Sequence, residues 1–421
     1  MNENIKKQFF EAMERAPSGK LGLSVSGGGD SVALLHLACS WAKKTDTELA
    51  VITIDHNLRE ESVLEANFVK SVANFYGIDH QTYMWKDKPK GNLQNLARNA
   101  RHQITANWAK GRELAAVLLG HTKDDQEETL MLRMLRGSGV DGMKGISETV
   151  IIGNLLFFRP LLSISREQLR NYLRSKNLDW REDPSNADDR FDRVKVRNIL
   201  SEMNKLGLQT SRLVSMSRHM TRASVALDNV TLELATSCME QKDWGDLNLD
   251  KDCFSVASYE IQLRLLSKAL CWVSGKTYKP RFTDLEKLCE SIICSKQMPG
   301  RSLMGVIIRT VKGKIIFTRE FSSLPKGLNV TSKTLVWDNR WELEVLVEKK
   351  SNLTISPLGE KSLILINNWK KSHIPREALV GSPSLFEGGN LICSPMASFG
   401  SGLHIKLLGG NNAFFNSFEY Y

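Results

Sequence analysis

Ser26-Gly27-Gly28-Gly29-Asp30-Ser31 is the stretch that decides the fold. It follows a short apolar run, Leu21 to Val25, and leads into the helical pattern Val32 to Trp41. Glycines let backbone N–H groups approach an anion closely, and the N-terminus of the following helix adds a favourable dipole. A strand, a glycine turn and a helix in this order predict a phosphate-binding loop for a nucleotide. The alternative is an ordinary tight turn after a strand.

This loop differs from the Walker A pattern GxxxxGK[ST], in which a lysine binds the terminal phosphates. Two candidate pairs, Gly19-Lys20 and Gly275-Lys276, have Glu14 and Leu270 where that pattern needs its first glycine. Without the lysine, we expect chemistry that cleaves ATP between its α and β phosphates. Asp30 is a candidate to hold Mg²⁺ on the phosphates.

The first half of the chain alternates strand-like and helix-like patterns. The expected strands are Leu21–Val25, Leu49–Ile54, His80–Met84 and Ala115–Leu119, and the expected helices are Val32–Trp41, Ser62–Tyr76 and Leu93–Lys110. This alternation predicts an α/β fold with a doubly wound parallel sheet, whose ligands bind beyond the carboxyl ends of the strands. Three strands are followed by polar segments, Ser26–Ser31, Asp55–Arg59 and Gly120–Gln126, which we expect to form one cleft.

The charge of the chain favours a polyanionic partner. A formal net charge of +10 over 421 residues is by itself a weak indication, since many proteins without such a partner are basic. Between residues 159 and 222, however, 14 Lys or Arg stand against 8 Asp or Glu. Spacing of three or four residues places cations on one helix face, as in Arg166, Arg170 and Arg174, and in Arg190, Arg193 and Arg197.

The length of the chain predicts two or three domains. A glycine-broken connection, Arg136–Gly145, precedes a pair of strands within Thr149–Phe158. Further helices are expected at Ser165–Asn177, with Ser165 as N-cap, and at Val194–Asn204, Ala223–Glu240, Val256–Val273 and Thr283–Ser295. A β-like run, Ser302–Phe317, turns at Gly313, and short strands fill Thr331–Tyr421. We therefore predict domains at 1–220, 221–328 and 329–421, the second mainly helical and the third β-rich.

The N-terminal segment and the cysteines indicate a cytoplasmic protein. Met1–Lys20 is charged and lacks an apolar core, so we expect neither a signal peptide nor a membrane span. The seven cysteines form no Cys-x-x-Cys pair, and the closest two, Cys289 and Cys294, lie in a helical apolar pattern. We expect reduced core residues, which weakens any function in which a cysteine carries sulfur or an iron–sulfur cluster.

These motifs make the chain similar to a known family: it resembles the bacterial tRNA(Ile)-lysidine synthetases, which belong to the PP-loop, or N-type, ATP pyrophosphatases. The resemblance is strong over roughly residues 18 to 200 and is diffuse beyond them. It rests on Ser26–Ser31, Asp55-His56 with Leu58-Arg59, Ala97-Arg98 with Arg101, Gly120-His121 with Asp124–Gln126 and Glu128-Thr129, Arg136–Gly139, Arg159–Leu162, and Trp180 through Glu182–Asn186 to Arg190, Arg193 and Arg197. One departure is His102, where the family usually has tyrosine, and we expect a local packing change there.

The resemblance implies an adenine nucleotide α-hydrolase-like fold and a reaction on the CAU anticodon of an isoleucine tRNA. ATP adenylates the carbonyl oxygen at C2 of the wobble cytidine and pyrophosphate leaves. The ε-amine of free L-lysine then attacks C2, AMP leaves, and the resulting lysidine makes the tRNA decode AUA as isoleucine. The base must leave its stack to react. Members of the family use ATP and Mg²⁺ and are often homodimers.

For the nucleotide, the resemblance implies that the loop binds the phosphates and that Asp55 contacts adenosine. The loop residues are Ser26, Gly27, Gly28, Gly29, Asp30 and Ser31, with Asp30 both catalytic and the metal ligand. His121 is the candidate for stabilising charge or moving a proton, because imidazole acts as acid or base near pH 7. An isolated histidine after a strand is more often structural.

For lysine, the candidates are Asp124, also assigned as catalytic, Asp125 and Gln126. Asp125 could instead cap the helix that follows. Arg98 and Arg101, one helical turn apart, would bind phosphate or the lysine carboxylate, unless they form an ordinary solvated helix face.

For tRNA, the candidates are Arg190, Arg193, Lys195 and Arg197, with Arg197 reaching the reacting phosphate. Phosphate contacts give affinity but not identity, so discrimination against the methionine tRNA with the same anticodon is expected from the C-terminal domains.

Three other functions are compatible with parts of the sequence. A PP-loop tRNA thiolase would need cysteines near the cleft, and only Cys39 lies in the catalytic half. A relative of GMP synthetase would need a glutaminase segment, which we do not find. A noncatalytic nucleotide- or RNA-binding module would bind ATP or tRNA without releasing pyrophosphate.

Overall fold

A six-stranded sheet forms the centre of the N-terminal part of the chain. The computed structural model describes residues 2–55, 61–84, 93–152, 155–182, 192–295, 298–347 and 352–418. The sheet contains β1 (Leu21–Ser24), β2 (Leu49–Asp55), β3 (Asp79–Met84), β4 (Ala116–Leu119), β5 (Thr149–Ile152) and β6 (Leu155–Phe158). Its order is β3-β2-β1-β4-β6-β5, with every neighbouring pair parallel except β5 and β6. The predicted parallel sheet is confirmed, with one antiparallel edge strand.

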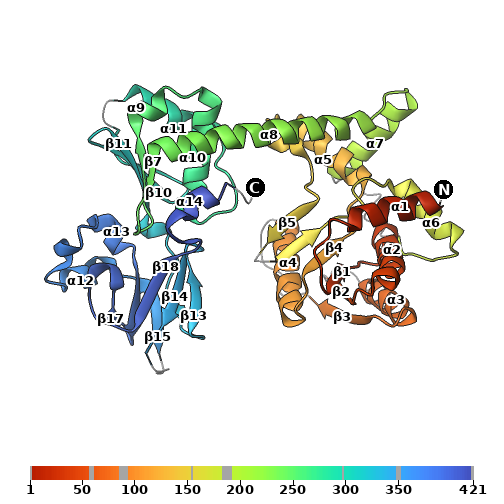
Figure 1. Cartoon of the computed structure of the whole chain (residues 1–421), viewed down its shortest axis with the longest axis horizontal. Helices are drawn as coiled ribbons and strands as arrows, with labels where there is room; N and C mark the ends of the chain where they lie inside the picture. Colours follow the sequence, from red (N-terminus) through yellow and green to blue (C-terminus); the bar gives the residue numbers. More distant parts are fainter. Residues whose placement is uncertain are drawn as a thin grey trace. The chain divides into compact units, whose positions relative to one another are not determined.

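Helices cover both faces of this sheet (Figure 1). The helices up to residue 238 are α1 (Asn2–Met13), α2 (Gly29–Thr45), α3 (Glu61–Phe75), α4 (Leu93–Gly111), α5 (Lys123–Leu135), α6 (Arg166–Ser175), α7 (Asp192–Lys205) and α8 (Ser211–Cys238). Of these, α7 packs against α5, and α8 continues into the second unit. Side chains of α1, α2, α3 and α6 share one hydrophobic cluster with one face of the strands, and α4 packs on the opposite face. The chain divides into two compact units, Met1–Ser224 and Val225–Tyr421. The division into three domains stays a prediction.

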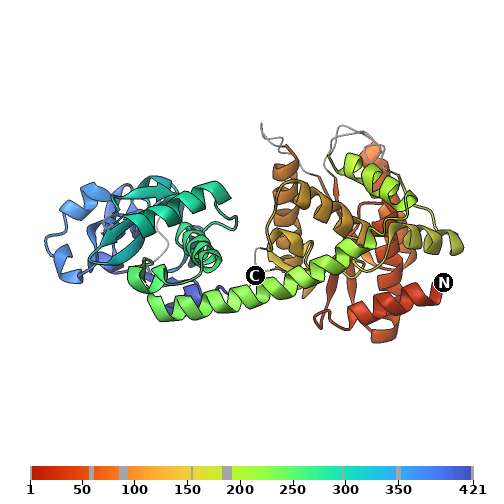
Figure 2. The same cartoon turned by 90° about the horizontal axis from the view of Figure 1, so that it is seen from above.

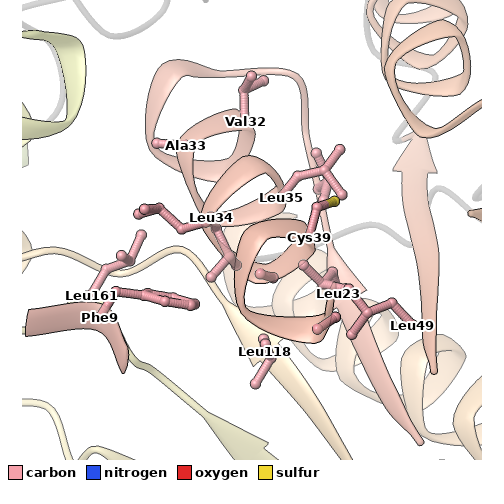
Figure 3. Packing of buried hydrophobic residues seen from close by; sticks show 14 of the residues in the cluster. Phe9, Leu23, Val32, Ala33, Leu34, Leu35, Cys39, Leu49, Leu118 and Leu161 are labelled. Atoms are coloured by element: carbon pink, nitrogen blue, oxygen red, sulfur yellow. The ribbon is translucent and has the colours of Figure 1, made fainter. Parts of the chain in front are cut away.

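Helix α2, which follows the glycine loop, is buried on nearly all sides (Figure 3). Leu34, Leu35 and Cys39 pack among residues of the strands and of α1, such as Leu23 and Phe9. A helix that is apolar all round is stable only inside a core. The loop at its N-terminus is therefore carried by one of the most firmly packed helices of the unit.

Helix α1 was not predicted, because the charged residues of the N-terminal segment hide its apolar stripe. Ile5, Phe9 and Met13 follow one another at four-residue spacing, and all three side chains are buried. This segment thus belongs to the core of the first unit.

The second unit contains a helical part with its own sheet, followed by a β-rich part. Its first elements are β7 (Met239–Gln241), β8 (Leu247–Asp250), α9 (Lys251–Ser255), α10 (Tyr259–Ser274), α11 (Phe282–Cys294), β9 (Arg301–Leu303), β10 (Val306–Val311) and β11 (Lys314–Arg319). These strands form one antiparallel sheet in the order β7-β8-β11-β10-β9. The expected hairpin at Gly313 is present between β10 and β11, whereas β7 and β8 were not predicted. The helix expected at Ala223–Glu240 ends at Cys238, and β7 begins at Met239. Figure 2 shows α8, which leads into this unit, as one unbroken helix.

The β-rich part confirms the predicted character of the C-terminal region. Its elements are β12 (Leu328–Asn329), β13 (Thr334–Trp337), β14 (Trp341–Val345), β15 (Leu353–Pro357), α12 (Gly359–Ile364), α13 (Arg376–Val380), β16 (Pro383–Glu387), β17 (Asn390–Cys393), β18 (Leu403–Leu407) and α14 (Ala413–Asn416). They form two antiparallel sheets, β12-β15-β16-β17 and β13-β14-β18. After β18 the chain returns to the helical part, where Phe414 and Phe418 join its hydrophobic cluster.

A buried ion cluster joins the two parts of the second unit. The Asp338 carboxylate accepts hydrogen bonds from Nε and Nη2 of Arg319, both at 2.9 Å, and from Nε of Arg340 at 3.2 Å. Arg340 also donates to the carbonyl oxygen of Gly245 at 3.0 Å. A buried charge needs such partners to offset the loss of water.

All seven cysteines are free thiols, as expected from their spacing. Cys294, at the end of α11, is exposed rather than part of the core. Of the helices within the described residues, none has an apolar stretch long enough to cross a bilayer.

The buried Asp246 makes the stability of the second unit depend on pH. Burial raises its pKa to about 6, although the Thr318 hydroxyl, which donates to Oδ2 at 3.0 Å, works against this shift. Its favourable contribution is complete below the unfolded pKa of about 3.9 and is lost as pH rises through about 6. We expect Asp246→Asn to raise the free energy of unfolding by roughly 2 kcal/mol at pH 8 and by little at pH 4.5.

Urea unfolding followed by hydrogen exchange in β8 and β11 would measure this difference. Asp243→Asn, at an exposed position three residues earlier, is the control for losing one surface charge. An effect of Asp246→Asn that is the same at both pH values would contradict the prediction.

Candidate nucleotide-binding and catalytic site

The site lies where the strand order of the sheet reverses. β1 and β4 are neighbours at the centre, Ser24 of β1 is paired with Leu119 of β4, and the connections from these strands run to different sides. Such a reversal opens a crevice at the carboxyl ends of the strands. α2 begins after β1 and α5 after β4, so the two helix N-termini face the same region.

The glycine loop between β1 and α2 is held by hydrogen bonds around Ser31. Its hydroxyl donates to the carbonyl oxygen of Gly28 at 2.9 Å and accepts from the N–H of Ser26 at 3.2 Å. Gly27 has φ +92°, which favours glycine. A Cβ on Gly120, after β4, would lie 3.3 Å from the backbone of Ser31. The two segments predicted to meet, one after β1 and one after β4, are in close contact.

A second segment, 178–182, packs against this loop and forms a hydrogen bond with it. The Arg181 N–H donates to the carbonyl oxygen of Gly27 at 3.0 Å. The ring of Trp180 lies so close to Gly29 that a Cβ there would be 3.3 Å from it. Gly27 is needed for its positive φ angle, whereas Gly29 is needed because a side chain there would crowd Trp180.

Arg166, the first residue of α6, is the centre of the charged site. Its guanidinium lies 3.3 Å from Oδ2 of Asp30 and also pairs with Asp125 and with Glu128, which is only 2% exposed. Its backbone N–H donates to Oδ2 of Asp124 at 2.8 Å. Four acidic side chains from α2 and α5 therefore converge on one residue.

The surroundings shift the pKa values of two of these acids in opposite directions. Burial raises the pKa of Asp30 to about 6, an effect that the charges of Arg166 and Arg170 reduce and that of Asp125 increases. Burial works in the same direction on Asp125, but Arg166 and hydrogen bonds from Thr122 hold its pKa below the ordinary value.

Asp125 also caps α5, as the sequence allowed. The backbone N–H and the hydroxyl of Thr122 donate to Asp125 Oδ2 at 2.8 and 3.0 Å, and the Asp125 N–H donates back to Thr122 Oγ1 at 3.4 Å. Gln126 is similarly occupied, since its amide pairs with the N–H and the carbonyl of Ile146 at 2.7 and 2.6 Å.

His121 is oriented by a buried arginine. Arg159, 4% exposed, donates from Nε to His121 Nδ1 at 3.2 Å and from Nη1 to the carbonyl oxygen of Ser147 at 2.8 Å. Because a guanidinium only donates, Nδ1 carries the lone pair and the proton of the neutral ring lies on Nε2. His102, the departure from the family pattern, packs edge-on against Phe157 at 5.2 Å.

A pocket of about 280 Å³, here called the arginine pocket, lies beside the acids. Its lining residues are Asp124, Arg166, Glu167, Arg170, Arg174 and Arg197. They come from α5, α6 and α7. Arg197 donates from Nε to Glu128 Oε1 at 2.9 Å, so Arg166 and Arg197 share this carboxylate.

The other predicted residues are exposed or lie outside the described part of the chain. Arg101 on α4 and Arg193 on α7 are exposed. The side chains of Asp55 and Arg98 are not among those described, and Arg190 lies outside the described residues. Within the described part of the chain, no three His, Cys, Asp or Glu side chains gather as a metal cluster. Asp30 alone still fits Mg²⁺, which nucleotide sites hold through one or two carboxylates together with substrate phosphates.

Comparison with known proteins decides the family. Residues 1–203 match the model of the PP-loop domain. Over 402 residues the chain is 36% identical to the tRNA(Ile)-lysidine synthase of Ruegeria pomeroyi, with 95% of this chain and 94% of the relative covered. The chain belongs to the tRNA(Ile)-lysidine synthase family.

A second relative agrees with this membership in the tRNA(Ile)-lysidine synthase family. The tRNA(Ile)-lysidine synthase of Wolbachia pipientis wMel is 35% identical over 347 residues, covering 81% of this chain and 80% of the relative. Among solved structures, the U34-tRNA thiolase NcsA of Methanococcus maripaludis has a TM-score of 0.46 and 16% identity. The matched region covers 52% of this chain and 78% of the thiolase chain.

The sequence does not predict the roles of Arg159, Arg166 and Glu128 in this member of the tRNA(Ile)-lysidine synthase family. The motifs contain Arg159 and Glu128 but give them no role, and the spacing of Arg166 predicts only a cationic helix face. The one available signal for Glu128 was its spacing of three and four residues from Asp125 and Asp124, which places all three near one side of α5.

We expect Arg166→Gln to destabilise the first unit strongly, because it leaves the buried Asp125 without its cation and leaves Glu128 with Arg197 alone. Breaking a buried ion pair from one side costs about 3 kcal/mol or more. Calorimetric unfolding would measure the change. Lys176→Gln, an exposed position just after the same helix, is the control and should change the free energy of unfolding by less than about 0.5 kcal/mol. Equal unfolding temperatures for the two variants would exclude this role of Arg166.

Proposed function

We propose that the chain catalyses ATP-dependent formation of lysidine at the wobble cytidine of the CAU anticodon of an isoleucine tRNA. The observation that carries this proposal is the 36% identity to a tRNA(Ile)-lysidine synthase along nearly the whole of both chains. ATP adenylates the C2 oxygen and pyrophosphate leaves. The ε-amine of lysine then attacks C2, and AMP leaves with the oxygen.

The glycine loop binds the ATP phosphates in this proposal. Its backbone N–H groups and the N-terminus of α2 provide positive potential, and Asp30 at the start of α2 is placed to hold Mg²⁺. When bound, Mg²⁺ neutralises charge on the phosphates. Ser31 supports the loop from inside, and Asp55, at the end of β2, contacts the adenosine.

His121, in the segment after β4, supplies a hydrogen-bond donor in this proposal. Because Nδ1 accepts from Arg159, the neutral ring donates through its Nε2–H group to the negative charge that develops as pyrophosphate or AMP leaves. Arg159 stays a cation and only donates, so it fixes the orientation of the ring.

Asp124 is better placed than Asp125 to bind lysine. Both carboxylate oxygens of Asp125 are bound by Thr122 and Arg166, whereas Asp124 lines the arginine pocket. A carboxylate next to the lysine ammonium can also accept the proton that the amine loses before attack. Arg98 and Arg101 remain the proposed partners of the lysine carboxylate.

For the tRNA, we assign Arg190, Arg193 and Arg197 to binding of the anticodon stem. We also propose that the enzyme acts in the cytoplasm as a homodimer. The exposed Arg193 can bind phosphate directly, whereas Arg197 also holds Glu128. The thiolase alternative is disfavoured, since burial raises the pKa of Cys39 to about 12 and keeps its thiol protonated.

The deciding experiment is pyrophosphate release from ATP with CAU-anticodon isoleucine tRNA, with and without lysine, followed by mass analysis of the anticodon nucleoside. We expect lysidine only when ATP, tRNA and lysine are all present. Pyrophosphate release without lysine incorporation would reopen the choice of nucleophile. No release at all would favour a noncatalytic binding module.

We expect Asp30→Ala to abolish pyrophosphate release and to leave tRNA binding nearly intact, because it removes the proposed Mg²⁺ ligand but no RNA contact. Asp46→Asn, at the exposed end of the same helix, is the matched control. Release rates and tRNA affinity would be measured for both variants. Full activity of Asp30→Ala would remove the phosphate-loop assignment.

A further inference from the structure

Two residues of the arginine pocket have no role in the proposed reaction so far, Arg170 and Arg174. They follow Arg166 on α6 at successive four-residue steps, so the three side chains lie along one face of the helix. All three line the same pocket. With Arg197 on α7, the pocket contains four arginines against two acids, Asp124 and Glu167.

The four arginines differ in how firmly they are bound. Arg166 and Arg197 pair with the buried Glu128, which fixes their positions. Among the described residues, Arg170 forms an ion pair with Glu182 at 3.8 Å, and the two side chains are 45% and 71% exposed. Surface pairs of this kind contribute between about 0 and 1 kcal/mol, so an incoming anion displaces Glu182 at little cost.

Among the described residues, the contacts that Arg174 makes are with neutral side chains. It donates to Asn171 at 3.1 Å, a neutral partner, and its guanidinium lies over the ring of Trp180, 5.9 Å from the centroid. The same ring packs against Gly29 of the glycine loop. Trp180 therefore lies between Arg174 and the glycine loop, and Arg166, which also lines the pocket, contacts Asp30 of that loop. The pocket is thus adjacent to the proposed site of the ATP phosphates.

We propose that Arg170 and Arg174 bind a backbone phosphate of the anticodon loop next to the nucleotide whose base enters the crevice. This assignment rests on the proposed function. Paired guanidinium groups match the geometry of a phosphate, and a nucleotide turned out of its stack needs its flanking phosphates held. The segment 178–182 then connects the bound RNA to the glycine loop through Trp180 and Arg181.

The test uses the full chain with Arg170→Gln and Arg174→Gln combined, and a synthetic stem-loop RNA with the CAU anticodon. Loss of charge-assisted contacts should weaken binding roughly tenfold or more. The slope of log affinity against log salt should fall by about 0.7 for a single-stranded phosphate. Lys176→Gln, at the exposed position just after the same helix, is the matched control and should leave both quantities unchanged. The affinity for pyrophosphate should be the same in all three proteins.

A second arm identifies the phosphate. Methylphosphonate replaces, one at a time, the phosphates on either side of the wobble cytidine. At one of these positions the replacement should weaken binding to the wild-type chain and have no effect on the double variant. The proposal would be overturned if the replacement weakened RNA binding equally in both proteins, or if the double variant bound RNA as tightly as the wild-type chain. It would also be overturned if the double variant lost affinity for pyrophosphate but not for RNA, because the pocket would then be a pyrophosphate site.

These outcomes are separate from the failure of the proposed function. RNA binding that depends on Arg170 and Arg174, without lysidine formation, supports the phosphate site and counts against the reaction. If the wild-type chain forms lysidine but its RNA affinity does not depend on either arginine, the reaction is supported and the phosphate site is excluded.

Discussion

The interaction on which the site depends is the set of contacts between Arg166 and the acids around it. Asp30 comes from α2, Asp125 and Glu128 come from α5, and Arg166 opens α6. Carboxylates this close repel one another and resist ionisation in a buried place. One guanidinium with several donors offsets that repulsion and at the same time fixes three helix ends around the crevice. These acids can therefore lie close together beside the glycine loop without destabilising the folded structure there.

The sequence could predict those features that local patterns encode. The strands from β1 to β4, the glycine loop and the Ser165 cap depend on neighbouring residues, and each is found as predicted. The meeting of the segments after β1 and β4 followed from the geometry of parallel sheets. The apolar stripe of α1 was hidden by its charged residues, and β7 was too short to give a periodic signal.

The charged contacts of the site could not be predicted in the same way, because they join residues far apart in the chain. Arg166 and Asp30 are separated by 136 positions, and Arg159 and His121 by 38. A pattern of cations on a helix cannot say whether each one faces water, an acid or a ligand. In α6 the answer changes from one turn to the next, since Arg166 is buried among acids and Arg170 is half exposed.

The path of the last residues has a consequence for synthesis of the protein on the ribosome. Phe414 is fully buried in the core of the helical part, where its ring meets that of Trp272 at 5.8 Å, and Phe418 lies beside it. That core stays incomplete until residues 413–418 have emerged, although most of its residues were made more than a hundred positions earlier. A chain that stops just before Ala413 would therefore leave the core of the helical part open, and cellular proteases would cleave it more readily.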